Sequence, residues 1–178
     1  MRIIVSVAVL IVVALAVFVQ TRPARFHIER SATIEAPSAA IFPHINDFHR
    51  WTAWSPWERI DPALQRSYDG RPSGLGAGYR WVGNNQVGEG SMRITESTPD
   101  REVRIALEFI KPFKASNTAT FTLVPEASGT RVTWAMDGEN TVVSKLMGLF
   151  MNMDRMIGGE FEKGLASLKG IAEGGATS

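Results

Sequence analysis

The sequence contains no cysteine and only three histidines. The absence of a thiol excludes cysteine nucleophiles, thiolate-bound metals and disulfide bonds. His27, His44 and His49 have no carboxylate at a metal-ligand spacing, so we expect them to be structural or solvent-exposed residues. P-loop, G-x-S-x-G, H-E-x-x-H and paired-carboxylate motifs are also missing. The sequence therefore predicts no catalytic set, metal site or cofactor, and an enzyme is not the favoured interpretation.

The sequence also lacks an excess of either charge. Its 19 Lys and Arg residues against 18 Asp and Glu residues give a formal net charge of +1, and no segment forms a basic stripe. Proteins that bind nucleic acid carry such a basic surface, so nucleic acid is not an expected partner. After the N-terminal segment about 150 residues remain, the usual size of one domain with its own core.

One long hydrophobic run is present at the N-terminus, from Ile3 to Val19, and arginines flank it on both sides. It lies at the short end of the ~17–25 residues that span a bilayer, and it exceeds the ~7–15 residues of a signal-peptide core. We interpret residues 1–20 as a transmembrane anchor and residues 21–25 as a tether. A signal cleaved near Ala16 is the alternative. The very short segment before the run favours a single-pass protein with an extracytoplasmic domain.

Alternation of apolar and polar residues predicts a series of β-strands after the tether. These segments cover residues 26–34, 64–68, 79–82, 91–95, 102–109, 118–123 and 131–136. Most are joined by short turns, so we expect an antiparallel sheet with one apolar face. The G-x-G-x-G segment at residues 74–78 is interpreted as a hairpin connection. A nucleotide-binding loop would need a helix after it, and here a strand follows.

Helical patterns stand near both ends of this series of strands. Pro37 suits the first turn of a short helix that bends at Pro43 and ends by Asn46. From Thr141 onward the chain is helical again, and its apolar stripe consists of Ile157, Phe161, Leu165, Leu168 and Ala172. Gly158-Gly159 divides this segment and marks either a bend or a close approach of backbones.

Three tryptophans, Trp51, Trp54 and Trp57, follow the first short helix. Such a loop is too apolar to lie free in solvent, so its rings either pack beneath the sheet or line an apolar opening. Together with the basic and aromatic segment at residues 111–114, it is also a candidate for contact with a bilayer.

These features together resemble the SRPBCC superfamily, which includes START-type lipid-transfer domains and polyketide cyclases. The resemblance rests on Ala36-Pro37, on residues 46–57, on Gly88-Glu89-Gly90, on residues 129–134 and on the closing amphipathic helix. It covers residues 26–173 and is closest to bacterial polyketide-cyclase-like proteins with an N-terminal membrane segment. It implies an α+β helix-grip fold, in which a curved antiparallel sheet wraps around one long C-terminal helix. Residues 174–178 are expected to form a disordered tail.

The resemblance also implies a cavity between sheet and helix that accepts an apolar molecule. Aromatic and methionine side chains are the candidates for the lining of this cavity, because they are large and apolar. They are Trp54, Trp57, Trp81, Phe109, Phe121, Trp134, Met136, Met147, Phe150, Met151 and Phe161. A plain core is the alternative for each of them. Arg30 and Arg80 lie among inward-facing apolar residues and are candidates for binding an anionic headgroup. Alternatively, each is a sheet-edge arginine with its charge in water.

We therefore expect a membrane-tethered domain that binds or transports a hydrophobic, lipid-like small molecule. A cyclase- or dehydratase-like enzyme acting on an aromatic substrate is the first alternative. It would need polar groups inside the cavity, and the inner strand positions are almost all apolar. A domain that binds a protein partner through its apolar rim is the second.

Overall fold

The computed structural model of the protein describes residues 2–149 and 151–174. One seven-stranded sheet forms the body of the domain, in the order β1-β7-β6-β5-β4-β3-β2, with every pair antiparallel. The strands are β1 (Arg25–Ile34), β2 (Gln65–Gly70), β3 (Ala77–Val82), β4 (Glu89–Thr98), β5 (Glu102–Lys111), β6 (Ala115–Glu126) and β7 (Gly129–Glu139). The predicted α+β fold with an antiparallel sheet is confirmed.

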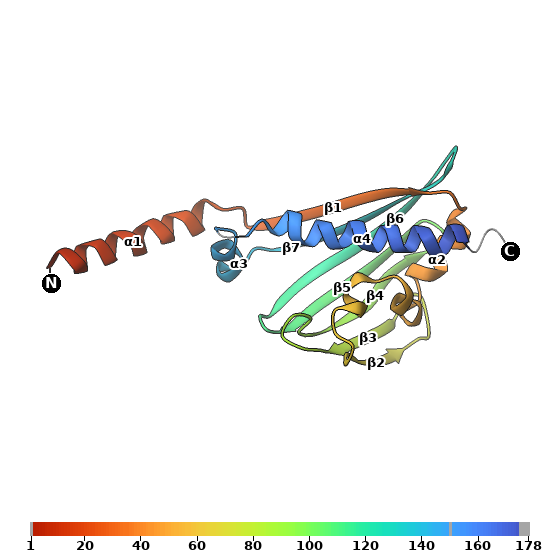
Figure 1. The fold of residues 1–178 in the computed structure, drawn as a ribbon, viewed down its shortest axis with the longest axis horizontal. Helices are drawn as coiled ribbons and strands as arrows, with labels where there is room; N and C mark the ends of the chain where they lie inside the picture. Colours follow the sequence, from red (N-terminus) through yellow and green to blue (C-terminus); the bar gives the residue numbers. More distant parts are fainter. Residues whose placement is uncertain (1, 150, 175–178) are drawn as a thin grey trace.

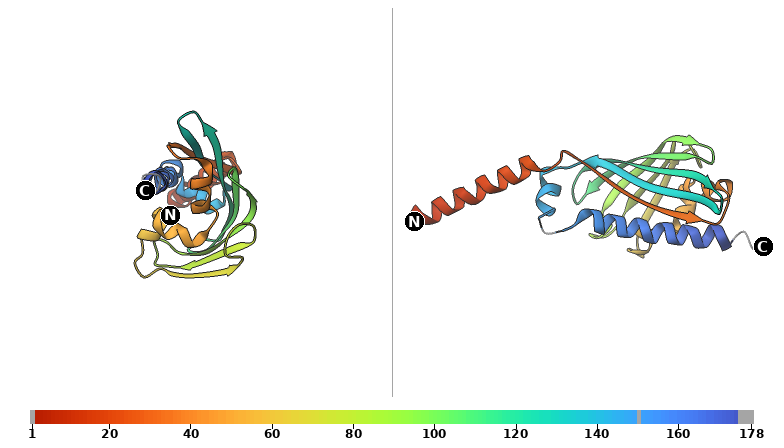
Figure 2. Two further views of the ribbon diagram at one scale, coloured as in Figure 1. Left: turned by 90° about the vertical axis from the view of Figure 1, so that its right-hand side faces the viewer. Right: turned by 90° about the horizontal axis from the view of Figure 1, so that it is seen from above.

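Helices occupy one side of this sheet and extend beyond one end of it. They are α1 (Arg2–Thr21), α2 (Ser38–Ile45), the 3-10 helices η1 (Phe48–Ala53) and η2 (Pro56–Arg59), α3 (Val142–Met147) and α4 (Met153–Gly174). The long helix α4 runs along the sheet, whereas α1 projects away from the domain (Figure 1). Seen end-on, the sheet curves around the helical elements (Figure 2). We call this covered side the concave face.

The short helix and tryptophan loop form as the sequence indicates. Pro37 precedes α2, Pro43 lies inside it, and Asn46 follows its last residue. Trp51 and Trp54 are buried, and their indole Nε1 atoms donate to the backbone oxygens of Ile45 and His44 at 3.0 Å each. These two rings pack beneath the sheet, so the hypothesis that they contact a bilayer is wrong.

The C-terminal helical segment differs from the prediction in where it breaks. α3 and α4 are separate helices, and residues 148–152 lie between them. The side chain of Asn152 accepts from the backbone N–H of Arg155 at 3.0 Å, which satisfies a donor in the first turn of α4. Gly158 and Gly159 both lie inside α4. Of the two interpretations of this pair, the close approach holds for Gly158, which packs on the guanidinium of Arg30.

Candidate functional site on the concave face

A cluster of aromatic rings fills the space between the sheet and α4. Trp134 on β7 lies at its centre, stacked on Phe161 of α4 with ring centroids 4.3 Å apart. The ring of Phe121, from β6, lies 4.7 Å from Trp134, and that of Trp54 lies 5.6 Å away. Alternation along the strands brings these side chains to one face, and the apolar stripe of α4 closes over them.

The predicted cavity residues divide into a buried set and a half-buried set. Trp54, Phe121, Trp134 and Phe161 are at most 2% exposed and form the core, and Trp81 and Met136 are also buried. Trp57, Phe109 and Met147 are half-buried, and Met151 is exposed. Phe150 lies outside the described residues. The buried residues are therefore ordinary core residues, which was the alternative to a cavity lining. Only the half-buried residues keep apolar surface that a ligand could contact.

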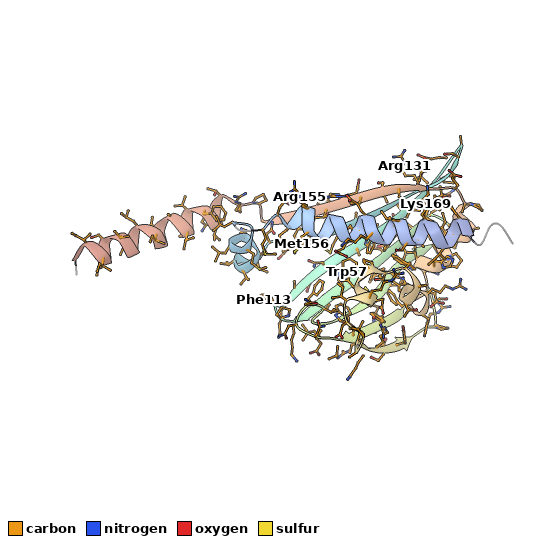
Figure 3. The ribbon with its side chains drawn as sticks, in the orientation of Figure 1. Trp57, Phe113, Arg131, Arg155, Met156 and Lys169 are labelled. Carbon is orange, nitrogen blue, oxygen red and sulfur yellow. The ribbon has the colours of Figure 1, made fainter. Side chains whose placement is uncertain are left out.

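Several half-buried apolar residues pack against the core without being fully covered. We call four of them the open strip: Trp57, Met92, Phe109 and Ile157. Met92 pairs with Tyr79 and Leu107 across the sheet, so it faces the concave side. The ring of Phe109 lies 5.8 Å from that of Trp81. Trp57, Met156 at the start of α4 and Phe113 at the β5–β6 turn can be followed in Figure 3.

Two buried polar atoms on the concave face have no hydrogen-bond partner among the described residues. They are the indole Nε1 of Trp134, a donor, and the side-chain Oδ1 of Asn117, an acceptor. Asn117 lies on β6, on the same face as Ala119 and Phe121. An unpaired buried polar group costs about 1–3 kcal/mol. A polar group supplied from outside the protein would recover part of that cost.

Arg30 faces the concave side, as its place among apolar residues indicated, but its donors are already used. Its guanidinium makes five hydrogen bonds: Nε to Glu162, Nη1 to the Glu29 backbone oxygen and to Asp154, and Nη2 to the Asp154 side chain and backbone oxygen. A guanidinium has five N–H groups. The hydrogen bond from Arg30 holds the pKa of the Asp154 carboxyl below its usual value. Arg30 therefore fastens α4 to β1, and no donor is left for a headgroup.

Arg80 lies on the opposite side of the sheet from the position expected. It is exposed and alternates along β3 with the buried Tyr79 and Trp81. Because successive strand residues point to opposite faces, the side chain of Arg80 leaves the sheet on its convex side. The alternative, an arginine with its charge in water, therefore describes Arg80 better than a headgroup ligand on the apolar face does.

A polar set around the buried carboxylate of Glu58, which the sequence reasoning missed, lies at the far edge of the concave face. Glu58 of η2 accepts from the hydroxyl of Tyr79 at 2.6 Å and from Nε of Arg66 on β2. Burial, followed by the hydrogen bond to Glu58, raises the pKa of Tyr79 far above its ordinary value. Period-two alternation puts Arg66 and Tyr68 on one face, but no sequence pattern places Glu58 beside them. Each carboxylate oxygen of Glu58 accepts one hydrogen bond, so this set fastens η2 to the sheet.

The described residues contain no evident metal-binding site. Across residues 2–149 and 151–174, no group of three or more His, Asp and Glu side chains is arranged to hold an ion. The chemistry of the concave face is therefore that of apolar contact with a few polar atoms at its edges.

Comparison with solved structures supports the fold. A protein of unknown function from Staphylococcus aureus is 11% identical with a TM-score of 0.63, and the match covers 86% of this chain and 97% of that one. The Aha1 dimer from Colwellia psychrerythraea is 14% identical with a TM-score of 0.59, covering 83% and 96%. DynU16, from the dynemicin biosynthetic locus, is 14% identical with a TM-score of 0.53, covering 84% of this chain and 48% of that one.

Sequence comparison identifies the family. No curated protein sequence matches the chain. Residues 25–173 match the family described as polyketide cyclase / dehydrase and lipid transport, which is nearly the whole of the domain after α1. The match begins at the first residue of β1 and ends within the last turn of α4, so it covers the sheet, the aromatic cluster and the helix that closes over it. The chain belongs to the polyketide cyclase / dehydrase and lipid-transport family.

Proposed function

We propose that the domain binds a hydrophobic, lipid-like molecule without changing it covalently, and that α1 holds the domain at a membrane. The observation that carries this proposal is the open strip. Trp57, Phe109 and Ile157 come from three different elements, and each keeps apolar surface uncovered on the concave face. A compact core would normally bury such side chains, so their uncovered surface is available to an apolar ligand.

The hydrophobic effect supplies most of the affinity in this proposal. Each Å² of apolar surface removed from water contributes about 25 cal/mol, less the cost of immobilising the ligand. Trp134 Nε1 and Asn117 Oδ1 add one donor and one acceptor for a polar group on the ligand. Glu58 is held by Tyr79 and Arg66, which favours binding over a reaction that needs a free base.

The membrane part of the proposal is supported by α1. Residues Ile3–Thr21 form a helix that is long and apolar enough to cross a bilayer, and none of this segment is buried by the domain. The same helix fits a signal sequence. We favour the anchor because the apolar run continues beyond Ala16, and we place the domain on the extracytoplasmic side.

The test is a binding titration on the full-length protein in nanodiscs. An environment-sensitive apolar fluorophore is added, protein-free nanodiscs serve as the blank, and fatty acids and polycyclic aromatics compete. Saturable binding is expected, and Phe109→Ala and Ile157→Ala should weaken it by about 1–3 kcal/mol each, the scale of one large apolar contact. Val124→Ala is the matched control, because Val124 is an exposed apolar residue of β6 on the convex side.

Two results would overturn the proposal. One is the absence of saturable binding above the blank. The other is a loss of affinity in Val124→Ala as large as that in Phe109→Ala. The competitors are also followed for product by mass spectrometry, because the family includes cyclases and dehydrases. Steady turnover that is lost in Glu58→Gln would replace the binding function with an enzymatic one.

A further inference from the structure

A depression of about 490 Å³ lies where the tether after α1 meets α3 and the segment before α4. We call it the junction pocket. Its lining comes from four parts of the chain: Arg22, Pro23, Phe26, Asn140, Ser144, Lys145, Gly148, Leu149, Met151, Asn152 and Met153. Its position at the domain end of α1 can be followed in Figure 1, where α3 lies beside the first residues of the domain.

One side of the junction pocket is cationic. Arg22 and Lys145 line it, and the lining includes no Asp or Glu. Neither cation takes part in an ion pair with the carboxylates of the described residues. The guanidinium of Arg22 lies 4.4 Å from the centre of the Phe18 ring, and Nζ of Lys145 donates to the backbone oxygen of Val19 at 3.2 Å. Two uncompensated positive charges so placed favour an anion.

The other side of the pocket is apolar and continues onto an exposed surface. Phe26, Leu149, Met151 and Met153 line it. Leu149 and Met151 are more than 40% exposed, and Val142 on the adjacent α3 is 60% exposed. Exposed aliphatic residues beside basic ones are typical of segments that lie in the interface of a bilayer.

The depth of the pocket relative to α1 matches this chemistry. Lys145 contacts Val19, the last residue of the apolar run, and Arg22 follows it. If α1 spans a bilayer, these two cations stand where lipid headgroups begin, and the apolar residues of α3 stand beside them. Beside a leaflet that contains anionic lipids, each Lys or Arg at this position contributes about 1 kcal/mol of attraction.

We propose that the junction pocket binds the phosphate of an anionic membrane lipid, whose headgroup has no cation of its own, with Arg22 and Lys145 as its ligands. The exposed residues of α3 would then contact the acyl region of the same leaflet. This inference rests on the membrane anchoring in the proposed function and adds a binding site for a lipid at the boundary of the bilayer. Phe26 also contacts Gly138 and faces the concave side, so the pocket lies at the anchor end of the open face.

The experiment is native mass spectrometry of the full-length protein released from nanodiscs that contain phosphatidylcholine and phosphatidylglycerol. The wild-type protein should retain phosphatidylglycerol in preference to phosphatidylcholine. Arg22→Gln and Lys145→Gln should each lower the retained fraction roughly fivefold, which is the effect of one interfacial charge. Arg25→Gln is the matched control: Arg25 is exposed at the first residue of β1, three residues after Arg22 but outside the pocket.

The outcomes separate the sources of phosphate and the two proposals. Equal loss in Arg25→Gln and Lys145→Gln would show general surface attraction and overturn the pocket. Displacement of the lipid by inorganic phosphate at the same concentration would show a site for free phosphate and overturn the lipid assignment. Unchanged fluorophore binding in Lys145→Gln, together with lost lipid retention, is the expected pattern. A Phe109→Ala variant that loses fluorophore binding but retains phosphatidylglycerol would show that the open strip and the junction pocket are separate sites.

Discussion

Arg30 shows how a charged side chain is accommodated on an apolar face. Its stem lies between Ile28 and Ala32 on β1, and its side chain is 25% exposed. Both carboxylates that it binds, Asp154 and Glu162, come from α4, one on each side of Gly158. The pair of ion pairs therefore fixes where α4 lies along β1. A charge that is bound in this way orients the helix and takes no part in the open strip.

A second charged group gives a pH-dependent prediction at the scale of one residue. His27 lies on the convex side of β1, where its Nδ1 is 2.7 Å from Asp137 Oδ1 and its Nε2 is 3.5 Å from Glu29 Oε2. The hydrogen bond to Asp137 is the largest cause that raises the pKa of His27 above 6.5. A raised folded-state pKa stabilises the fold fully below the unfolded-state pKa, and this stabilisation is lost as the pH rises through the folded-state value.

His27→Gln should therefore unfold more easily than the wild type near pH 5.5 and equally easily near pH 8.5, as the linkage predicts. The difference should not exceed about 0.5 kcal/mol, because the pair is exposed to solvent. Urea unfolding at the two pH values measures it, and an NMR titration of the imidazole gives the pKa. Asp137→Asn should bring that pKa back towards 6.5. A wild-type pKa below 6.5 would contradict the prediction.

At the scale of elements, the sequence predicts what repeats locally and misses what depends on distant partners. The strands and the stripe of α4 follow from periods of two and 3.6, so their existence and faces are predictable. The sequence places the division of the helical segment at Gly158-Gly159, whereas the chain breaks at residues 148–152. Gly158 continues the helix because Arg30, from β1, packs against it, and the sequence does not show this contact. The partners of Glu58 and of Lys145 are likewise set by tertiary packing. The junction pocket could not be predicted for the same reason.

The seating of α4 on the sheet gives a prediction for its glycines. A Cβ at Gly164 would lie 2.7 Å from Cζ3 of Trp134 and 3.1 Å from Cδ of Pro56, whereas a Cβ at Gly170 meets nothing within 4 Å. Gly164→Ala should lower the free energy of unfolding by about 1–3 kcal/mol, the usual cost of overpacking a core. Gly170→Ala should raise it by up to about 1 kcal/mol through helix propensity.

Chemical denaturation of both variants measures this difference within one helix. In a Trp134→Phe background, Gly164→Ala should lower the free energy of unfolding by less than it does in the wild type, since the smaller ring leaves room for the methyl group. Equal stability of Gly164→Ala and Gly170→Ala would show that α4 does not approach Trp134 as closely as the structure indicates.

At the scale of the whole molecule, several features that suit a membrane gather at one end. α1 leaves the domain beside α3, and the β5–β6 turn carries Phe113, which is 56% exposed, between Lys111 and Lys114 (Figures 1 and 3). β7 pairs with β6 so that Gly138 lies opposite Asn117, which puts the start of α3 and this turn at the same end of the sheet. Contact between residues 111–114 and a bilayer stays a prediction.

The anchor itself gives the last prediction. The full-length protein should remain with membranes after an alkaline carbonate wash and should keep Met1, because α1 is retained as a span. Deletion of residues 1–20 should release a folded domain into the soluble fraction, since these residues carry the long run of exposed apolar side chains that would span the bilayer. Ala16→Leu separates this from a cleaved signal: a large side chain blocks processing at a small-x-small site. If α1 is an anchor, the Ala16→Leu variant behaves like the wild-type protein. If α1 is a cleaved signal, the wild-type protein is shortened and soluble, whereas the variant is uncleaved and membrane-bound. A mature N-terminus just after Ala16 in the wild-type protein would contradict the anchor and, with it, the bilayer position of Arg22 and Lys145.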